Sequence, residues 1–134
     1  MRALVIEPNC CPYISIFTNF EEAVHQVIDG PHKIDLPFEN HVIALVSSKN
    51  QEGLKHNRCI NENEAVNGRA LICGWDGQNI RGLTKQQADR YYRRYLYPER
   101  IEDSPDGQLI IPVMTPHIKP KDERFGKKPN WLER

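Results

Sequence analysis

Hydrophobic residues near the start of the chain change from strand-like spacing to helix-like spacing. The segment ALVIE, residues 3–7, is aliphatic and β-branched, which predicts a buried strand. The segment YISIF, residues 13–17, alternates with period two, as expected for a strand that returns beside the first. An amphipathic helix follows, because apolar residues recur at helical spacing between a cap at Thr18 or Asn19 and a stop at Gly30.

Four further apolar segments predict strands in the rest of the chain. They are HKIDL at 32–36, HVIALVSS at 41–48, GRALICGW at 68–75 and QLIIPVM at 108–114. The second is almost continuously apolar and is therefore expected at the centre of a sheet. The last contains Pro112, which cannot donate a backbone hydrogen bond and favours a sheet edge.

A second helix is predicted between Thr84 and Pro98. Thr84 and Gln87 form a T-x-x-Q capping box, and the proline ends the helical pattern. Tyrosines on the apolar stripe of this helix alternate with arginines beside it, so Tyr91 and Arg94 are candidate binding anchors. The alternative is an ordinary amphipathic helix whose phenol groups reach water.

The element order β-β-α-β-β-β-α-β is typical of an α+β domain. We predict a small mixed β-sheet with about two helices packed on one of its faces. This single domain is expected to span residues 1–114. Residues 115–134 are rich in proline and lysine, and they are expected to form a C-terminal tail.

The segment GLKHNRCI, residues 53–60, places four polar side chains shortly after a glycine. We interpret it as a displayed turn in which Lys55, His56, Asn57 and Arg58 form a binding site. A guanidinium binds carboxylate or phosphate with two hydrogen bonds, and an amide reads the edge of a base. In the structural alternative, Asn57 bonds the turn backbone and Arg58 pairs with a nearby carboxylate.

The composition is that of an ordinary globular domain. Of the 134 residues, 39% are hydrophobic and 27% are charged, which excludes a chain disordered throughout. No apolar run approaches the roughly 20 residues that a membrane helix needs. The start of the chain also lacks the apolar core of a signal peptide. We therefore expect a cytoplasmic protein that does not contact membranes.

The net charge is zero, but the two halves of the chain differ. Residues 1–67 hold 5 basic and 9 acidic residues, and residues 68–134 hold 13 basic and 9 acidic residues, so the halves carry −4 and +4. A basic second half would suit nucleic acid or an acidic partner. We favour the alternative, in which these charges are the solvated surface of a helix and a tail.

The four cysteines, Cys10, Cys11, Cys59 and Cys73, have the spacing of neither a metal site nor a disulfide framework. We expect reduced thiols, no bound metal and no cofactor. The motifs G-x-x-x-x-G-K-[ST], G-x-G-x-x-G, H-E-x-x-H and G-x-S-x-G are also missing. We therefore expect a protein that is not an enzyme, and a cysteine-dependent enzyme built from Cys59 or Cys73 with a histidine is the third hypothesis.

Several segments together resemble a family of small uncharacterised proteins from bacteriophages, plasmids and other mobile elements. They are the start MRALVIEP, the helix NFEEAVHQVIDG, the strand HVIALVSS, the segment EGLKHNRCI, the strand ALICG and the helix LTKQQADRYYRRYLYPE. Members typically begin M-[KR]-A-[LM]-V-[VI]-E and share a domain of unknown function. The resemblance covers about residues 1–100 and includes the Asn-Arg pair, although many members have Pro-Pro where this chain has Lys55-His56.

Some proteins similar to this family have been put forward as inhibitors of CRISPR nucleases. The resemblance therefore implies a non-catalytic, anti-CRISPR-like phage protein that binds and inhibits a host defence component, such as a CRISPR effector nuclease, in the bacterial cytoplasm. The second hypothesis is capture of a small ligand or nucleotide-like signal, in which Arg58 and Lys55 hold phosphate. Capture needs a pocket around these residues, whereas an inhibitor that covers its target does not.

Deletion of residues 118–134 is expected to cost little stability, because this segment has two prolines and few apolar anchors. Thermal denaturation of the full and the truncated chain measures the difference. A fall in Tm of many degrees would show that the tail packs on the domain, with Trp131 and Leu132 as its anchors.

Overall fold

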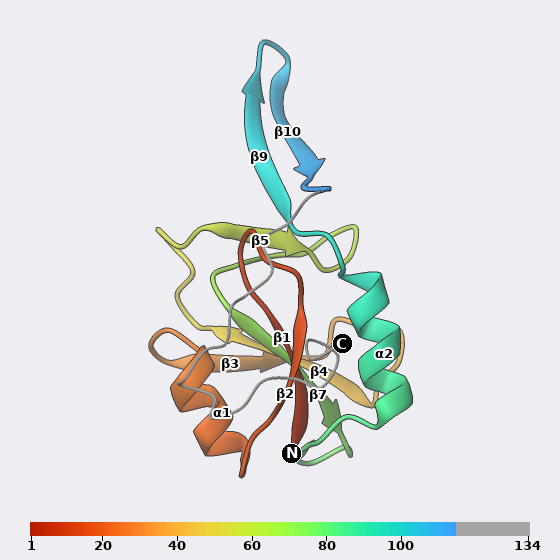
Figure 1. Cartoon of the computed structure of the whole chain (residues 1–134). Helices are drawn as coiled ribbons and strands as arrows, with labels where there is room; N and C mark the ends of the chain where they lie inside the picture. Colours follow the sequence, from red (N-terminus) through yellow and green to blue (C-terminus); the bar gives the residue numbers. More distant parts are fainter. Residues whose placement is uncertain (115–134) are drawn as a thin grey trace.

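An antiparallel sheet forms the centre of the protein (Figure 1). The computed structural model describes residues 1–114, and the predicted tail at 115–134 lies outside the described residues. Six strands form the sheet in the order β2-β1-β7-β4-β3, with β8 also paired to β7. They are β1 (Arg2–Ile6), β2 (Tyr13–Ile16), β3 (His32–Asp35), β4 (Ile43–Ser48), β7 (Ala70–Trp75) and β8 (Ile80–Arg81).

All pairings in this sheet are antiparallel, so the prediction of a mixed sheet is wrong. Short connections join β1 to β2 and β3 to β4, and such connections link antiparallel strands, whereas parallel neighbours need a longer crossover. The predicted central position of residues 41–48 is confirmed. β4 is buried at all six positions and lies between β7 and β3.

The two helices cover opposite faces of the sheet, so the prediction that both pack on one face is also wrong. Neighbouring residues of a strand point to opposite faces. Val5 lies in the core cluster that contains α1 (Phe20–Val27), whereas Leu4 lies in the cluster that contains α2 (Lys85–Arg94). The central strands are apolar on both faces, and each face requires cover. The α+β class holds in broad terms, although strands dominate the structure.

Both helices begin at the predicted caps. The Asn19 side chain accepts a hydrogen bond from the backbone N of Glu22 at 2.8 Å. Thr84 and Gln87 form the complete capping box, with hydrogen bonds of 3.1 and 2.9 Å. The helices have eight and ten residues, and no helix within residues 1–114 is long and apolar enough to cross a membrane.

A small hairpin lies on the α2 side of the core. It consists of β5 (His56–Cys59) and β6 (Ala65–Asn67), and Ile60 and Val66 belong to the core cluster that α2 covers. The prediction of a displayed polar turn over residues 53–60 is therefore wrong for its second half. That half is a paired strand whose two middle residues are buried.

A two-stranded hairpin projects from the domain beyond the end of α2 (Figure 1). It is formed by β9 (Glu99–Ser104) and β10 (Gly107–Pro112), which pair in antiparallel register along their whole length. We call residues 99–112 the arm. β10 confirms most of the strand predicted at 108–114, whereas β9 has no counterpart among the predicted elements.

Candidate functional site

Asn57 lies inside the protein, with an exposed fraction of 0%. Its side-chain amide donates hydrogen bonds to the carbonyl oxygens of Ile6, at 3.0 Å, and Gly68, at 2.8 Å. Gly68 has a φ of +78°, and a Cβ at this position would lie 2.7 Å from Leu54 Cδ1. The positive φ favours glycine at the position that presents its carbonyl to Asn57. Asn57 thus connects β5 to the end of β1 and to the turn after β6.

The Arg58 guanidinium binds backbone carbonyls rather than a carboxylate. Nη2 donates to the Cys10 carbonyl at 2.8 Å, and Nη1 donates to the Glu7 carbonyl at 3.4 Å and to the Asn57 Oδ1 atom. Nε donates to the Tyr97 carbonyl at 3.5 Å. These groups belong to β5, to the turn between β1 and β2, and to the segment that leads from α2 into the arm. One side chain therefore connects three parts of the chain.

Arg58 is only 1% exposed, and burial lowers its pKa to about 10. The nearby Glu99 carboxylate acts in the opposite direction. The guanidinium is therefore still charged at neutral pH, and a buried cation requires the hydrogen bonds that surround it. This position corrects the interpretation of Asn57 and Arg58 as displayed binding residues, because both side chains are directed into the fold.

The other two residues of the predicted turn have different environments. Lys55 is exposed, whereas His56 is partly buried, with its Nε2 atom 3.2 Å from Glu99 Oε1. The same carboxylate oxygen accepts a hydrogen bond from the backbone N of Cys59 at 2.7 Å. His56 and Cys59 therefore attach the base of the arm to β5. Of the four predicted turn residues, Lys55 alone is free to meet a partner without a change in structure.

The predicted anchors on α2 also make internal contacts. Tyr91 is 1% exposed, with its ring stacked on Tyr95 and edge-on to Phe38. The Arg94 guanidinium lies over these rings, 5.3 Å from the centre of Tyr95, and pairs with Glu39 at 3.0 Å. Tyr91 is therefore a core residue, which corrects its interpretation as an exposed anchor. Arg94 remains partly exposed at the edge of the aromatic cluster.

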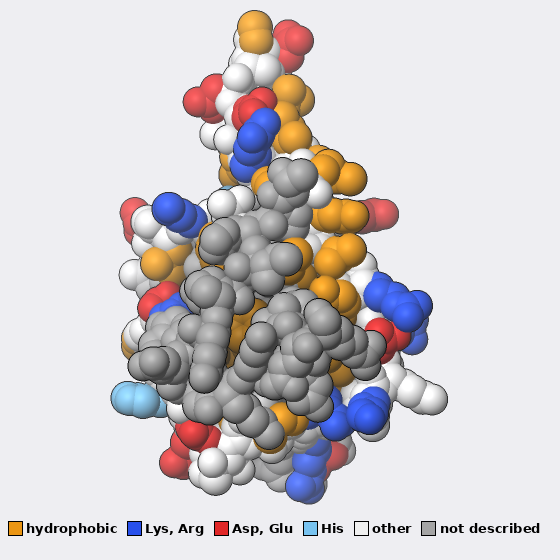
Figure 2. Space-filling model, viewed as in Figure 1, with side chains coloured by type: hydrophobic (Ala, Val, Ile, Leu, Met, Phe, Trp, Pro, Cys, Tyr) orange, Lys and Arg blue, Asp and Glu red, His pale blue; other side chains and the backbone are white. Residues whose placement is uncertain are grey.

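Three of the exposed aliphatic side chains lie on the arm. Ile101, Leu109 and Ile110 are 43%, 52% and 51% exposed, and Figure 2 shows hydrophobic side chains along the arm and continuing below it on the α2 side. Ile101 and Ile110 are direct cross-strand partners and therefore lie on the same face of the hairpin. Leu109 lies on the opposite face, because neighbouring residues of a strand alternate.

The arm also carries a net negative charge, and a proline lies on the outer edge of β10. Four acidic residues and one basic residue give it a net charge of −3, and Arg100 pairs with Glu102 at 2.7 Å. The backbone N of Val113 donates to the Pro98 carbonyl, so alternate residues of β10 direct their backbone groups towards β9. Pro112 consequently faces the outer edge of β10, where it offers no N–H group.

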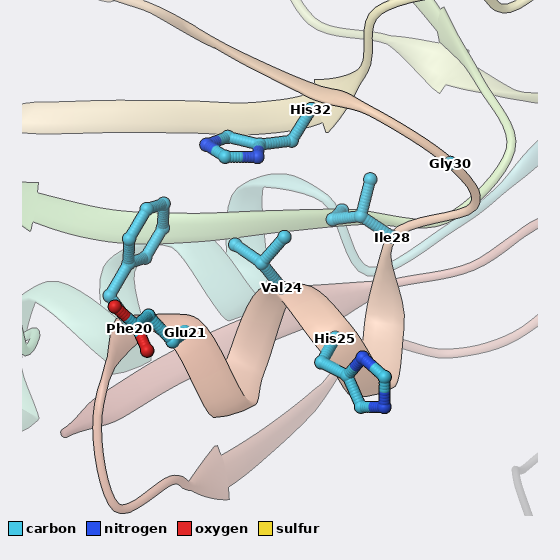
Figure 3. Close-up of a pocket in the computed structure, with 7 residues that line it drawn as sticks. All are labelled: Phe20, Glu21, Val24, His25, Ile28, Gly30 and His32. Carbon is cyan, nitrogen blue, oxygen red and sulfur yellow. The ribbon is translucent and has the colours of Figure 1, made fainter.

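A pocket of about 480 Å³ lies between α1 and the start of β3 (Figure 3). In Figure 3, Phe20, Val24 and Ile28 point from the α1 side towards His32 on β3. The Phe20 and His32 rings meet edge to face, with their centres 5.5 Å apart. Glu21, His25 and Gly30 complete the lining. The pocket combines an apolar wall with imidazole and carboxylate groups, which is the usual character of a small-molecule site.

Cys59 and Cys73 do not have the lowered pKa of activated nucleophiles. All four cysteines are free thiols. Burial raises the pKa of Cys73 to about 12, and burial together with the Glu99 carboxylate raises the pKa of Cys59. A nucleophilic cysteine needs a lowered pKa, so these values weigh against the cysteine-dependent enzyme. Within the described part of the chain, no group of three or more His, Cys, Asp or Glu residues is placed to hold a metal ion.

The family model of DUF3846, a domain of unknown function, matches residues 1–96. The chain belongs to this family. The DUF3846 region contains the six-stranded sheet, both helices and the buried pair of Asn57 and Arg58, and it ends before the arm. Membership in a family whose domain has no assigned function, as the sequence resemblance implies, is thus confirmed. No curated protein and no solved structure matches the chain.

Local sequence patterns predict β10 but not β9, because ERIEDS contains a single apolar residue and reads as a polar loop. The signal that identifies the arm is Asp106-Gly107, a turn dipeptide that is followed after Gln108 by an apolar run.

The pocket residues Phe20, Val24 and Ile28 are predicted as part of the α1 apolar stripe. In the structure Ile28 is buried, whereas Phe20 and Val24 remain partly exposed in the pocket.

The variant Arg58→Ala is expected to lower the free energy of unfolding by about 3 kcal/mol, because buried carbonyls lose their donor and a cavity remains. The neighbouring variant Lys55→Ala is the control, with a change within about 0.5 kcal/mol, since Lys55 is exposed. Chemical denaturation measures both values. An Arg58→Ala protein of unchanged stability that no longer binds a partner would restore the surface role of this residue.

Proposed function

We propose that the protein is a non-catalytic binding protein that inhibits a macromolecular partner by covering part of its surface. The arm carries this proposal. It places the cross-strand pair Ile101 and Ile110, each about half exposed, on one face of an element that stands away from the domain. Clustered apolar side chains of this kind supply most of the energy of a protein–protein contact, whereas small ligands bind in concave sites.

The properties of the arm define the surface that it would bind. An apolar groove would accept Ile101 and Ile110, and basic groups around it would complement the net charge of −3. The hydrogen bonds from Arg58 to Tyr97 and from Cys59 to Glu99 hold the base of the arm, so less freedom is lost on binding than with a mobile loop. Many proteins that bind nucleic acid have positively charged clefts, and such a cleft would offer the basic groups that the arm requires.

A host defence component is the partner that we propose, and a CRISPR effector nuclease is the specific candidate. Support for this choice comes from the resemblance to proteins of phages and other mobile elements, some relatives of which have been put forward as inhibitors of such nucleases. The acidic arm adds a physical reason, since a nuclease presents basic surface to its substrate. Under this proposal the protein acts in the cytoplasm of a bacterial host.

The double variant Ile101→Thr/Ile110→Thr is expected to weaken partner binding by about 2 kcal/mol or more, because it removes two apolar anchors. Threonine keeps the β-branched shape that the strands favour, so the arm itself is retained. The measurement is affinity capture from host lysate with identification of the retained proteins, followed by a nuclease inhibition assay on the captured enzyme.

A matched control for this experiment is Ile16→Thr/Ile34→Thr. These isoleucines also lie in strands and are 45% and 39% exposed, but they are outside the arm. The control variant should capture the same proteins as the unaltered chain. Equal capture by the arm variant and the control variant would show that the arm is not the binding site.

A second function, capture of a small ligand, is favoured by the pocket between α1 and β3. Phe20, Val24 and Ile28 would contact an apolar or aromatic part of the ligand, while His32 would bind a polar or anionic group. This site replaces the one expected around Asn57 and Arg58, whose side chains are occupied inside the fold. A nucleotide-like compound is one ligand with both kinds of group.

Under this second function, the unaltered protein is expected to release a bound small molecule on denaturation, detected by mass spectrometry. Val24→Trp places a large side chain in the pocket and should abolish the signal. Val42→Trp is the control, because Val42 is 46% exposed and does not line the pocket. If all three proteins release the same compounds, the pocket does not bind them.

A further inference from the structure

β3 forms an open edge of the central sheet. It is the last strand in the sheet order, and within residues 1–114 only β4 pairs with it. The backbone N of Lys49 donates to the Pro31 carbonyl at 2.7 Å, in register with the pairing of β3 and β4. Because successive residues of a strand direct their backbone groups to opposite edges, those of His32 and Ile34 face away from β4. Among the described residues, these outward groups have no hydrogen-bond partner.

The side chains of β3 also divide between the two faces of the sheet. Ile34 is the cross-strand partner of Val46, which belongs to the core cluster under α1, so Ile34 lies on the α1 face. Leu36 continues this alternation, and the two side chains are 39% and 43% exposed. Lys33 and Asp35 lie on the other face, where they pair at 3.4 Å. β3 therefore has an apolar face beside the pocket and a charged face opposite to it.

Residues 32–36 have a sequence that is complementary to itself in antiparallel pairing. The sequence is HKIDL, with Ile34 at its centre. When two copies pair with Ile34 opposite Ile34, Lys33 of each copy lies opposite Asp35 of the other, and His32 lies opposite Leu36. The two neighbouring registers that also join the outward backbone groups place Lys33 opposite Lys33 or Asp35 opposite Asp35. Like charges directly opposite each other are destabilising, so charge selects the register centred on Ile34.

We propose that the protein forms a two-fold symmetric dimer in which β3 of one copy pairs antiparallel with β3 of a second copy. The outward backbone groups of His32 and Ile34 supply the hydrogen bonds, as when an extended segment adds to an open sheet edge. A two-fold axis at Ile34 makes both halves of the contact identical and closes the assembly at two copies. Because this axis is perpendicular to the sheet, both α1 helices lie on the same face of the joined sheet.

The pocket between α1 and β3 lies where a side chain of the second copy arrives. His32 lines this pocket (Figure 3), and Leu36 of the other copy is its direct cross-strand neighbour on the α1 face. Phe20 and Val24 supply the apolar wall. The volume of about 480 Å³ leaves room for a leucine side chain. An exposed leucine and an open apolar pocket therefore cover each other, once in each half of the dimer.

The dimer goes beyond both proposed functions. The arm and β3 lie apart in the molecule (Figure 1), so a partner bound to the arm leaves β3 accessible. A small ligand in the pocket would compete with Leu36 of the other copy. The dimer is tested with the purified full-length chain, without lysate or added ligand. Its failure and the failure of either proposed function are therefore distinguishable.

The unaltered protein is expected to sediment as a dimer, and two charge reversals on β3 test its register. Lys33→Glu brings carboxylates together at both halves of the contact, and Asp35→Lys brings ammonium groups together. Each variant alone should raise the dimer Kd by about tenfold or more, measured by analytical ultracentrifugation after circular dichroism has confirmed folding. An equimolar mixture of the two variants should form a mixed dimer of restored affinity, because opposite charges again meet at both halves.

The control for these variants is Lys85→Glu, which makes the same change of charge at an exposed residue of α2. It should leave the dimer Kd unchanged. Restored affinity in the mixture cannot come from the pair within one chain, because each chain of the mixture still carries two like charges at positions 33 and 35.

Two substitutions of Ile34 test the backbone contact. Ile34→Pro removes an N–H group that faces away from β4, so the hydrogen bonds between β3 and β4 are retained while the dimer loses two hydrogen bonds at its axis. Ile34→Thr keeps the N–H group and the β-branched shape. The proline variant should sediment as a folded monomer, whereas the threonine variant should still dimerise.

Three results would overturn the proposal. The unaltered protein would sediment as a monomer at every concentration, or the mixture of Lys33→Glu and Asp35→Lys chains would remain monomeric. Alternatively, a folded Ile34→Pro protein would dimerise as well as the unaltered protein, which would show that another surface forms the dimer.

Discussion

The arrangement of the protein depends on a charged Arg58 side chain held among backbone carbonyls. A buried cation is costly, and the cost is offset only where its donors meet acceptors with good geometry. Those acceptors come from Cys10 and Glu7 after β1 and from Tyr97 after α2. The turn after β1 and the segment after α2 must therefore both be in place before the hydrogen bonds of Arg58 offset the cost of burying its charge. This requirement makes their positions interdependent, and it fixes the direction in which the arm leaves the domain.

The buried pair of Asn57 and Arg58 lies in one region of the chain, and the arm lies in another. Asn57 and Arg58 lie within the region that matches the family, whereas the arm follows its end at residue 96. Glu99 and Tyr97 bridge the two regions, because each is bonded to β5. The family domain thus acts as a rigid support, and the surface proposed for binding is an element built onto it. Asn57 and Arg58, which the sequence suggests as binding residues, are instead buried in the domain that supports the arm.

Both helices and six of the ten strands in residues 1–114 are predicted by local patterns. The apolar runs at 3–7, 41–48 and 68–75 and the caps at Asn19 and Thr84 correspond to observed elements. The side of the sheet that each helix covers was not predictable, since these runs are apolar on both faces. The burial of Arg58 depends on carbonyl groups up to 51 residues away in the chain, and no local pattern contains that information.

Pro112 on the outer edge of β10 has a consequence for how this protein behaves at high concentration. An exposed aliphatic hairpin is the kind of element on which further strands can be added without limit, giving fibrils. Continuous strand addition requires an N–H group at each second position along the edge, and the proline interrupts that row. The missing N–H group at Pro112 therefore hinders the addition of a further strand along β10.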